Sequence, residues 1–228
     1  MDLHYRDFNM TIPVYFLHNG EDNMQDNWFR LNQKTKDAIA VEAVGTIFES
    51  HKHIANMCQE DRFYVVDADC WIVESFNFDK QIDLKPRSVA VFRAKNPVNG
   101  LVYGHQAMIA YNKTLTLNNK GMGLDFTLDD PHESVEILSG IANFNTDPYS
   151  TWRTAFREVI KLKSDYSDMA AERLNIWTTV ANGEFADSCL QGAKDAVEYY
   201  DSVMGDIEEL KKSYEWSWLS EFYAKKHK

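Results

Sequence analysis

The stretch Phe63-Tyr64-Val65-Val66-Asp67-Ala68-Asp69 decides the fold that this chain is expected to adopt. A short apolar run that ends in acidic residues is typical of a buried parallel strand that delivers carboxylates to the carboxyl edge of a sheet. Open α/β sheets bind their ligands at that edge. Two carboxylates there suit Mg²⁺ or Mn²⁺, and such an ion is normally shared with substrate phosphates. Asp67 and Asp69 are therefore the predicted metal and donor-phosphate ligands.

The spacing of the two acids is the Asp-x-Asp signature of nucleotide-sugar glycosyltransferases. Taken alone it is a weak signal, because the chain holds 35 Asp and Glu among 228 residues. The alternative is a strand end that carries two solvated acids. The rest of the chain has to decide between these interpretations.

The composition predicts a folded domain with a real core, since 44% of the residues are hydrophobic and 13% are aromatic. No run of 18 apolar residues occurs, so no membrane span is expected. Residues 1–7 lack a basic region followed by an apolar segment, which argues against a secretory signal. Three cysteines without metal-ligand spacing (Cys58, Cys70 and Cys189) fit a reducing cytosol.

The net charge of −11 and the pI of about 5.1 favour solubility. They disfavour nonspecific binding of nucleic acid, because phosphate contacts need Lys and Arg. A nucleic-acid substrate would require a local basic patch.

The first part of the chain alternates between strand and helix patterns, which predicts a parallel sheet with right-handed crossovers. Thr46 and Glu49 form a capping-box pattern at the start of the second helix. The expected strands are 12–17, 38–44 and 63–66, and the expected helices are 26–31 and 47–59.

Further strands are expected at 88–94, 107–111 and 141–144. From Asp147, a good N-cap followed by Pro148, the pattern becomes helical. The helices that follow are expected at 165–180, 184–204 and 207–225. The prediction is thus an α/β fold, a mixed sheet flanked by helices over residues 1–146, with a helical C-terminal region over 147–228 packed on it.

Polar residues after the first strand are candidates for donor binding. His18 and Asn19 lie in the loop that runs beside the base and ribose in nucleotide-binding α/β domains. Lys52, on the helix before the Asp-x-Asp strand, is a candidate contact for a phosphate or the base. The alternatives are an ordinary polar turn and a solvated helix face.

A second group lies in and around the turn-rich segment 93–105. Loops dense in Asn, Gly and aromatic residues suit a sugar or acceptor pocket, because amides pair with hydroxyls and rings stack. A purely structural turn is the alternative. The candidates are Arg93, Asn96, Asn99, Tyr103 and His105.

Two further carboxylates, Asp147 and Asp125, are candidates for a general base, although Asp147 also suits a role as helix cap alone. Arg153, Arg157 and Lys161 recur every four residues and form one basic stripe, either for phosphates or for solvent. His132 is a weaker candidate for completing a metal site.

Three blocks in this order carry a resemblance to a known family: the Asp-x-Asp strand, Asn96-Pro97-Val98-Asn99-Gly100-Leu101-Val102-Tyr103-Gly104, and the segment from Phe144 to Glu158. The chain resembles a family of tailed-bacteriophage proteins that are similar to GT-A-type glycosyltransferases. Members of that family are thought to attach a sugar such as glucose or arabinose to hydroxymethylated pyrimidines of phage DNA. The resemblance covers roughly residues 12–200.

The resemblance implies a GT-A-like (Rossmann-like) fold and a metal-dependent glycosyltransferase in the cytoplasm of an infected bacterium. It implies a nucleoside diphosphate sugar as donor, most simply a UDP-sugar. The acceptor would be a hydroxyl on a phage DNA base or on its attached sugar. Asn96, Asn99, Tyr103 and Gly104 would lie in the second block of the family, and Asn145, Thr146, Asp147, Trp152 and Arg153 would lie in the third.

The chain departs from the family directly after the second block. Relatives carry Gly-Tyr-Gly-Gly-Val-Lys-Leu where this chain has Gly104-His105-Gln106-Ala107-Met108-Ile109. The identity of the sugar and acceptor stays open for that reason, as does the choice between inversion and retention.

Two rival functions remain open. A nucleotidyltransferase also needs paired acids and Mg²⁺, but a Gly-rich loop with Lys or Arg would then be expected after the first strand. A non-enzymatic structural or host-interaction protein of a phage is the second rival, and the acidic charge is compatible with it.

Overall fold

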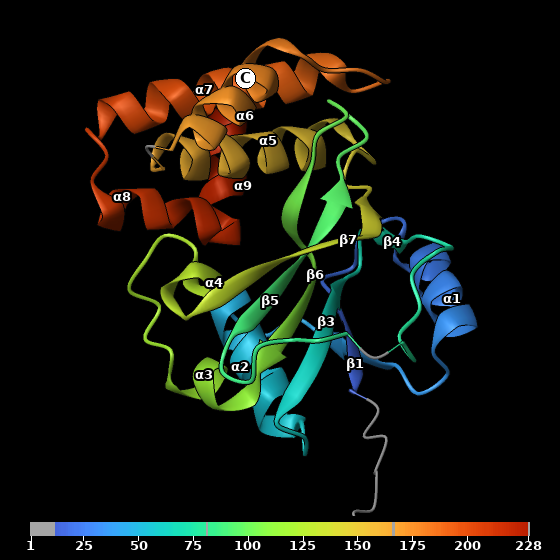
Figure 1. Ribbon diagram of the computed structural model, residues 1–228. Coiled ribbons are helices and arrows are strands. Elements are labelled where there is room, and N and C mark those ends of the chain that lie inside the picture. Colours follow the sequence, from blue (N-terminus) through green and yellow to red (C-terminus); the bar gives the residue numbers. More distant parts are fainter. Residues whose placement is uncertain (1–11, 81, 166, 228) are drawn as a thin grey trace, which may run out of the picture.

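The computed structural model describes residues 12–80, 82–165 and 167–227, and the N-terminal residues considered for a secretory signal lie outside these ranges. Figure 1 shows a sheet with helices on both sides and a helical layer, α5 to α9, gathered at one end of it. No helix of the described part is long and apolar enough to cross a membrane.

The first five elements confirm the predicted β-α-β-α-β start. They are β1 (Val14–His18), α1 (Met24–Lys34), β2 (Ile39–Glu42), α2 (Ile47–Met57) and β3 (Arg62–Asp67). β1 pairs in parallel with both β2 and β3, so that Leu17 faces Val41 on one side and Asp67 on the other. The carboxyl ends of all three strands therefore meet at one edge of a Rossmann-like sheet.

Successive residues of β1 point to opposite faces of the sheet, as the pleat of a strand requires. Val14 and Phe16 join the larger buried cluster, which contains Leu31 of α1. Tyr15 and Leu17 join a second cluster, which contains Ile54 of α2. The two crossover helices thus cover opposite faces.

The predicted capping box at the start of α2 is confirmed. The Glu49 N–H donates to Thr46 Oγ1 at 3.2 Å, and the Thr46 N–H donates to Glu49 Oε2 at 2.7 Å. Both bonds satisfy backbone donors that have no partner within the helix. The first turn of α2 is therefore fixed where it borders the carboxyl edge of the sheet.

The second half of the sheet contains β4 (Cys70–Ile72), β5 (Val89–Lys95), β6 (Val102–Asn112) and β7 (His132–Ala142). In the described residues the sheet order is β2-β1-β3-β6-β5-β7-β4. β6 pairs antiparallel with β3 and β5, whereas β5 and β7 are parallel. A mixed sheet flanked by helices was predicted and is confirmed.

Several expected boundaries in this half were wrong. The strand expected at 107–111 begins at Val102, and the one expected at 141–144 instead occupies 132–142. The start of β7 consists mostly of polar residues that are exposed or partly exposed, so it lacks the apolar run of a buried strand. The short helices α3 (Lys113–Asn118) and α4 (Phe126–Asp129) were not expected, and each begins at a polar N-cap, Asn112 and Asp125 respectively.

The helical part contains α5 (Pro148–Lys163), α6 (Asp168–Thr179), α7 (Ala186–Ser202), α8 (Ile207–Lys211), the 3₁₀ turn η1 (Lys212–Tyr214) and α9 (Trp216–Lys226). One helix over 207–225 was expected, and this was wrong because the chain becomes extended at Glu215. In a continuous helix, residues 214 and 216 would point about 200° apart. With the break, Tyr214 and Trp216 both pack against arginines of α5.

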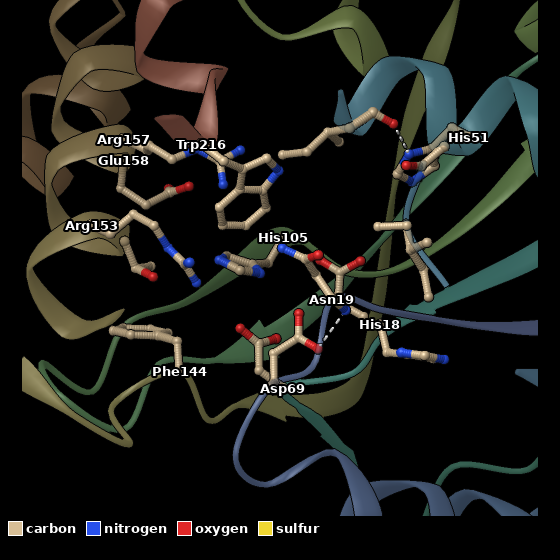
Figure 2. A pocket seen from close by; sticks show the side chains of 17 residues that line it. His18, Asn19, His51, Asp69, His105, Phe144, Arg153, Arg157, Glu158 and Trp216 are labelled. Carbon is tan, nitrogen blue, oxygen red and sulfur yellow. Dashed lines mark hydrogen bonds between the residues drawn. The ribbon is translucent and has the colours of Figure 1, made fainter. Parts of the chain in front are cut away.

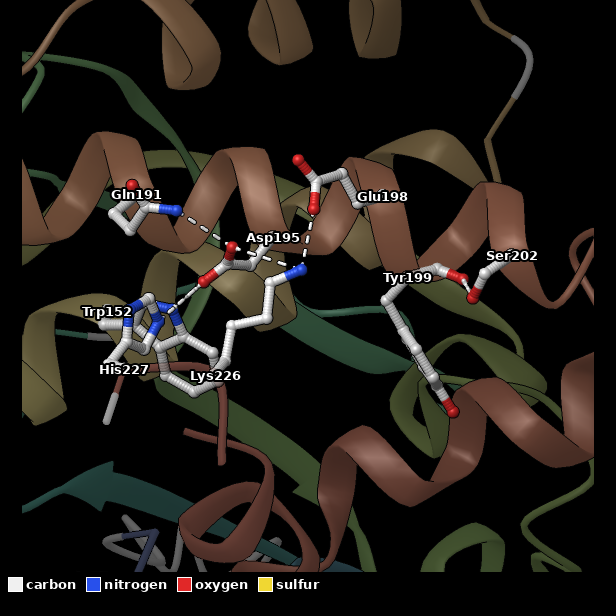
Figure 3. A network of polar contacts seen from close by, with 8 residues as sticks. All are labelled: Trp152, Gln191, Asp195, Glu198, Tyr199, Ser202, Lys226 and His227. Carbon is white, nitrogen blue, oxygen red and sulfur yellow. Dashed lines mark hydrogen bonds and ion pairs between the residues drawn. The ribbon is translucent and has the colours of Figure 1, made fainter. Parts of the chain in front are cut away.

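A buried aspartate joins three of these helices (Figure 3). Asp195 of α7 accepts hydrogen bonds from the indole N–H of Trp152 on α5, at 2.8 Å, and from Gln191, at 2.9 Å. His227, next to α9, lies with Nε2 2.8 Å from the same carboxylate. Fully buried carboxylates are stable only with such partners. The contacts therefore fix the C-terminal helix against α5 and α7.

We expect Gly192→Ala to destabilise the protein, because α7 crosses α5 there without room for a side chain. A methyl group at position 192 would lie 2.3 Å from the Trp152 carbonyl oxygen. Overpacking against backbone costs about 1–3 kcal/mol, which exceeds the gain in helix propensity. Urea denaturation measures the loss. Lys194→Ala, at an exposed position of the same helix, is the control and should change stability by less than about 0.5 kcal/mol.

Candidate functional site

A cleft with about 860 Å³ of space, counting its open mouth, lies at the carboxyl edge of the three parallel strands (Figure 2). The ends of β1 and β3 form its floor, and the first turns of α2 form one side. β6, α5 and the start of α9 supply the remaining walls. The lining residues therefore come from both predicted parts of the chain.

The Asp67-Ala68-Asp69 segment is held by its backbone. The Ala68 N–H donates to the Leu17 carbonyl at 2.9 Å, and the Asn143 N–H donates to the Asp69 carbonyl at 2.8 Å. The Asn27 side chain donates to the Ala68 carbonyl at 2.8 Å. These backbone contacts anchor the segment, so its position does not depend on hydrogen bonds from the two carboxylates, which line the cleft.

Negative charge accumulates at this floor. Burial, the neighbouring Asp69 and Glu21 together raise the pKa of Asp67 well above its usual range. Burial and Glu21 raise the pKa of Asp69 to about 6, although Arg153 and Arg157 act in the opposite direction. The carboxylates are therefore short of positive partners, and a bound cation would favour their ionised forms.

Two arginines of α5 line the opposite wall. The Arg153 guanidinium stacks on the Trp216 ring at 4.4 Å, and that of Arg157 stacks on Tyr214 at 4.5 Å. Among the described residues neither arginine has a carboxylate within 4.0 Å, and Arg157 Nε is buried without a hydrogen-bond partner. Both guanidinium groups are thus positioned by aromatic rings and remain available to an anion.

Lys161 completes the basic stripe but behaves differently from the arginines. It pairs with Glu158 on its own helix and lies 3.8 Å from Asp125. Burial opposes ionisation of Glu158, but Lys161, His105 and Tyr103 lower its pKa to about 2. Of the stripe predicted on α5, Arg153 and Arg157 line the cleft, whereas Lys161 is paired with acidic side chains and does not line it.

The donor set fits the expected divalent metal. Within residues 12–80, 82–165 and 167–227, no three His, Cys, Asp or Glu side chains gather as a closed metal site. Two carboxylates with neighbouring space are nevertheless the protein ligands that Mg²⁺ uses when phosphates complete its coordination. His132 does not join them, because its Nδ1 lies 3.1 Å from the Asp130 carbonyl at the start of β7.

The other end of the cleft is formed by His18, Asn19, Ala43, Ile47 and His51. His51 Nδ1 lies 2.7 Å from the Ile47 carbonyl, to which it donates as N–H. Burial lowers the pKa of His51 to about 4, so its ring is neutral at physiological pH.

The residues of this end that were predicted to bind the donor substrate do not all line the cleft. His18 and Asn19 line the cleft as expected, and the Asn19 N–H donates to Glu21 at 2.8 Å. Lys52 instead lies over the Phe48 ring and is not among the lining residues. The preceding residue, His51, reaches the cleft in its place.

Of the candidates in segment 93–105, only His105 lines the cleft. Arg93 pairs with Glu136. Asn96 and Asn99 accept hydrogen bonds from the backbone of their own turn, both at 3.2 Å. The Tyr103 hydroxyl donates to Glu158 at 2.7 Å. These contacts are those of the structural turn that was the alternative, whereas the amide nitrogens Asn96 Nδ2 and Asn99 Nδ2 have no hydrogen-bond partner among the described residues.

The candidates of the third block are also divided. Trp152 is fully buried and bonds Asp195, away from the cleft. Asp147 caps α5 and lines an adjoining hollow together with Asp69 and Arg153. Burial opposes ionisation of Asp147, but hydrogen bonds from Ser150 and Tyr149 lower its pKa. Asp125 caps α4 and does not line either space.

Sequence reasoning did not select several residues that the cleft brings together. Arg157 was visible as part of the basic stripe, and Glu21 and His51 each lie next to a chosen residue. Trp216 carried no local signal, because it lies 147 positions from Asp69 and reaches the cleft only through the break at Glu215.

We expect Asp69→Asn to stabilise the metal-free protein in a pH-dependent way. The folded-state pKa of about 6 lies above the ordinary value of 3.8. The cost of ionising Asp69 is therefore absent below about pH 4, grows up to about pH 6 and persists above it. The variant should gain on the order of 1–3 kcal/mol at pH 8 and almost nothing at pH 4. Denaturation curves in EDTA measure this, with Asp37→Asn in an exposed turn as control. Equal gains at both pH values would contradict the assignment.

Comparisons with known proteins show distant likeness only. No protein-family model and no curated protein matches the chain. The bifunctional IspDF from Campylobacter jejuni matches with a TM-score of 0.35 and 15% identity, over 55% of this chain and 49% of that one. A structure of S. aureus TarS 1–349 matches with a TM-score of 0.45 and 11% identity, over 90% and 81%. The glycosyltransferase GlyE of Streptococcus pneumoniae TIGR4 matches with a TM-score of 0.32 and 13% identity, over 85% and 56%. The chain thus spans about half the length of the IspDF chain, and none of these likenesses carries an argument about function.

Proposed function

We propose that this protein is a metal-dependent glycosyltransferase that uses a nucleoside diphosphate sugar, most simply a UDP-sugar. One observation carries the proposal: Asp67 and Asp69 lie across a single cleft from Arg153 and Arg157. The carboxylates suit a Mg²⁺ or Mn²⁺ ion, and the guanidinium groups suit phosphate oxygens. A diphosphate with its metal is the ligand that both sides would accept together.

The ends of the cleft suit the remaining parts of such a donor. The apolar and polar residues between β1 and α2, among them Ile47 and His51, would receive the base. The adjoining hollow, lined by Asp69, Asp147 and Arg153, lies at the other side of the carboxylates and suits the acceptor. In this proposal the reacting sugar carbon would lie between the two spaces.

The chain's own residues have separable tasks in this proposal. Arg153 and Arg157 would orient the diphosphate, and Asp67 and Asp69 would hold the metal, which would supply Lewis-acid stabilisation of the leaving diphosphate. In an inverting reaction Asp147 would accept the proton of the acceptor hydroxyl, because it lines the adjoining hollow and its lowered pKa keeps it ionised. Asp125 is the less suitable base, since it lines neither space.

The loop after β1 favours sugar transfer over nucleotidyl transfer. A nucleotidyltransferase would present Lys or Arg to the triphosphate from this loop. Here the loop contains Glu21 and Asp22, and Glu21 lies against the carboxylate pair.

The acceptor is proposed as a hydroxyl group. The resemblance to the phage family supports a hydroxymethylated base of phage DNA or its attached sugar. Among the described residues, Arg93 and Lys163 pair with Glu136 and Asp201, so these two cations already have acidic partners in place of DNA phosphates. Mass spectrometry of nucleosides from phage DNA, made with and without this gene, tests that acceptor. A sugar-bearing nucleoside that disappears with the gene is the supporting outcome.

We expect UDP with Mn²⁺ to raise the melting temperature of the protein, and neither component alone to give the full shift. Asp67→Ala combined with Asp69→Ala should abolish the combined effect, because the metal loses its protein ligands. Differential scanning fluorimetry measures both. If UDP, GDP, ADP, CDP and dTDP all give no shift with Mn²⁺ or Mg²⁺, the protein is not this enzyme, and the non-enzymatic alternative gains.

We expect Arg157→Met to weaken UDP binding by about tenfold or more, because a charge-assisted hydrogen bond to phosphate is lost while the packing on Tyr214 is largely kept. Lys163→Met is the matched control, since Lys163 lies on the same helix but pairs with Asp201 outside the cleft. Calorimetry with Mn²⁺ measures both variants. Equal loss in the two would show that Arg157 acts through helix stability.

A further inference from the structure

His105 stands at a defect in the sheet. β5 and β6 pair on both sides of this defect: Arg93 lies opposite Gly104 on one side, and Val91 lies opposite Ile109 on the other. Four residues of β6, 105–108, therefore stand opposite the single residue Phe92. Such bulges bend a strand and change the direction of its side chains, and they occur often beside active sites. Here the bulge lies where β6 passes the carboxyl end of β3, and the His105 ring lines the cleft (Figure 2).

The bulge also fixes which nitrogen of the ring carries the proton. The Ala107 N–H, displaced from the ladder, donates to His105 Nδ1 at 3.1 Å. An accepting Nδ1 has no proton, so the neutral ring carries its proton on Nε2. Burial lowers the pKa of His105, against the pull of Glu158, which keeps the ring neutral.

Among the residues that the structure describes, no protein atom accepts from the Nε2–H group. His105 Nε2 is buried and lacks a hydrogen-bond partner among the described residues. An unpaired buried donor costs on the order of 1–3 kcal/mol, so its presence in a cleft calls for an explanation. The neighbouring Arg157 Nε shows the same deficit. Two unpaired N–H donors on residues that line the same cleft point to a ligand that brings acceptor oxygens.

We propose that His105 donates its Nε2–H to an oxygen of the donor diphosphate and so helps to select a phosphorylated ligand. This inference rests on the proposed function. A neutral donor suits this place, because Arg153 and Arg157 already supply positive charge and a third cation would repel them.

Calorimetry on the full chain with Mn²⁺ tests this inference. The ligands are whichever of UDP, GDP, ADP, CDP and dTDP the wild type binds most tightly, and the matching nucleoside. We expect His105→Leu to weaken nucleoside diphosphate binding by about tenfold or more, since a hydrogen bond to a charged oxygen is lost. Nucleoside binding should stay unchanged. His105→Gln, whose amide nitrogen can occupy the place of Nε2, should retain most of the affinity.

The outcomes separate this inference from the proposed function. If the wild type binds none of the nucleoside diphosphates, both fall. If it binds one of them but His105→Leu binds it equally well, or loses the nucleoside equally, only the role of His105 is overturned. Loss of Mn²⁺ binding in the absence of nucleotide would make His105 a metal ligand and would also overturn the proposal.

A measurement on the wild type does not depend on the folding of the leucine variant. In protein labelled with ¹⁵N-histidine, the ring signals of His105 should show the Nε2–H form before ligand is added. They are assigned by their absence in His105→Gln. The Nε2–H signal should move on addition of the nucleoside diphosphate and stay in place with the nucleoside. A signal that ignores the diphosphate contradicts the contact.

Discussion

The cleft depends on keeping opposite charges apart. Asp67 and Asp69 would gain from contact with Arg153 and Arg157, and the raised pKa values of the aspartates show how much compensation they lack. The fold prevents that contact by binding each pair to something else. Backbone hydrogen bonds hold the aspartate segment at the end of β3. Aromatic rings hold the arginines on α5. A metal ion on the aspartate side and a diphosphate on the arginine side would each supply the opposite charge that these side chains lack.

The aromatic support of the arginines is built from the far end of the chain. Trp216 and Tyr214 stand on either side of the break before α9, and α9 is fixed by His227 and Asp195 (Figure 3). Rings of α9 continue this packing, since Trp218 and Phe222 stack on each other and contact Phe156 of α5. The C-terminal helix therefore belongs to the site, even though only Trp216 of that helix lines the cleft.

Those parts of the architecture that depend on local patterns could be predicted from the sequence. The β-α-β-α-β start, the capping box at Thr46 and the position of Asp67 follow from short runs of residues whose spacing has one physical meaning. The strand at 132–142 was misplaced because half of its residues are polar, and burial there is decided by pairing with β5. The break at Glu215 could not be predicted, since the contacts that it allows, with Arg153 and Arg157, depend on where these arginines lie in space. Lys52 and His51 show the same limit on a smaller scale, because the rotational position around helix α2 determines which of these two neighbours faces the cleft.

The turn-rich segment 93–105 shows how composition alone misleads. Asn, Gly and aromatic residues suit a sugar pocket and a tight turn equally well, because both need amides and hydroxyls that bond at short range. Asn96 and Asn99 bond their own turn, and Tyr103 bonds Glu158, which in turn holds Lys161. Glu158 lines the cleft together with His105 and Arg157, so the segment supports the cleft through Tyr103 and contributes His105 to its lining. Rigid support of this kind holds an unpaired N–H group in a fixed direction. A ligand can then accept its hydrogen bond without any rearrangement of the protein.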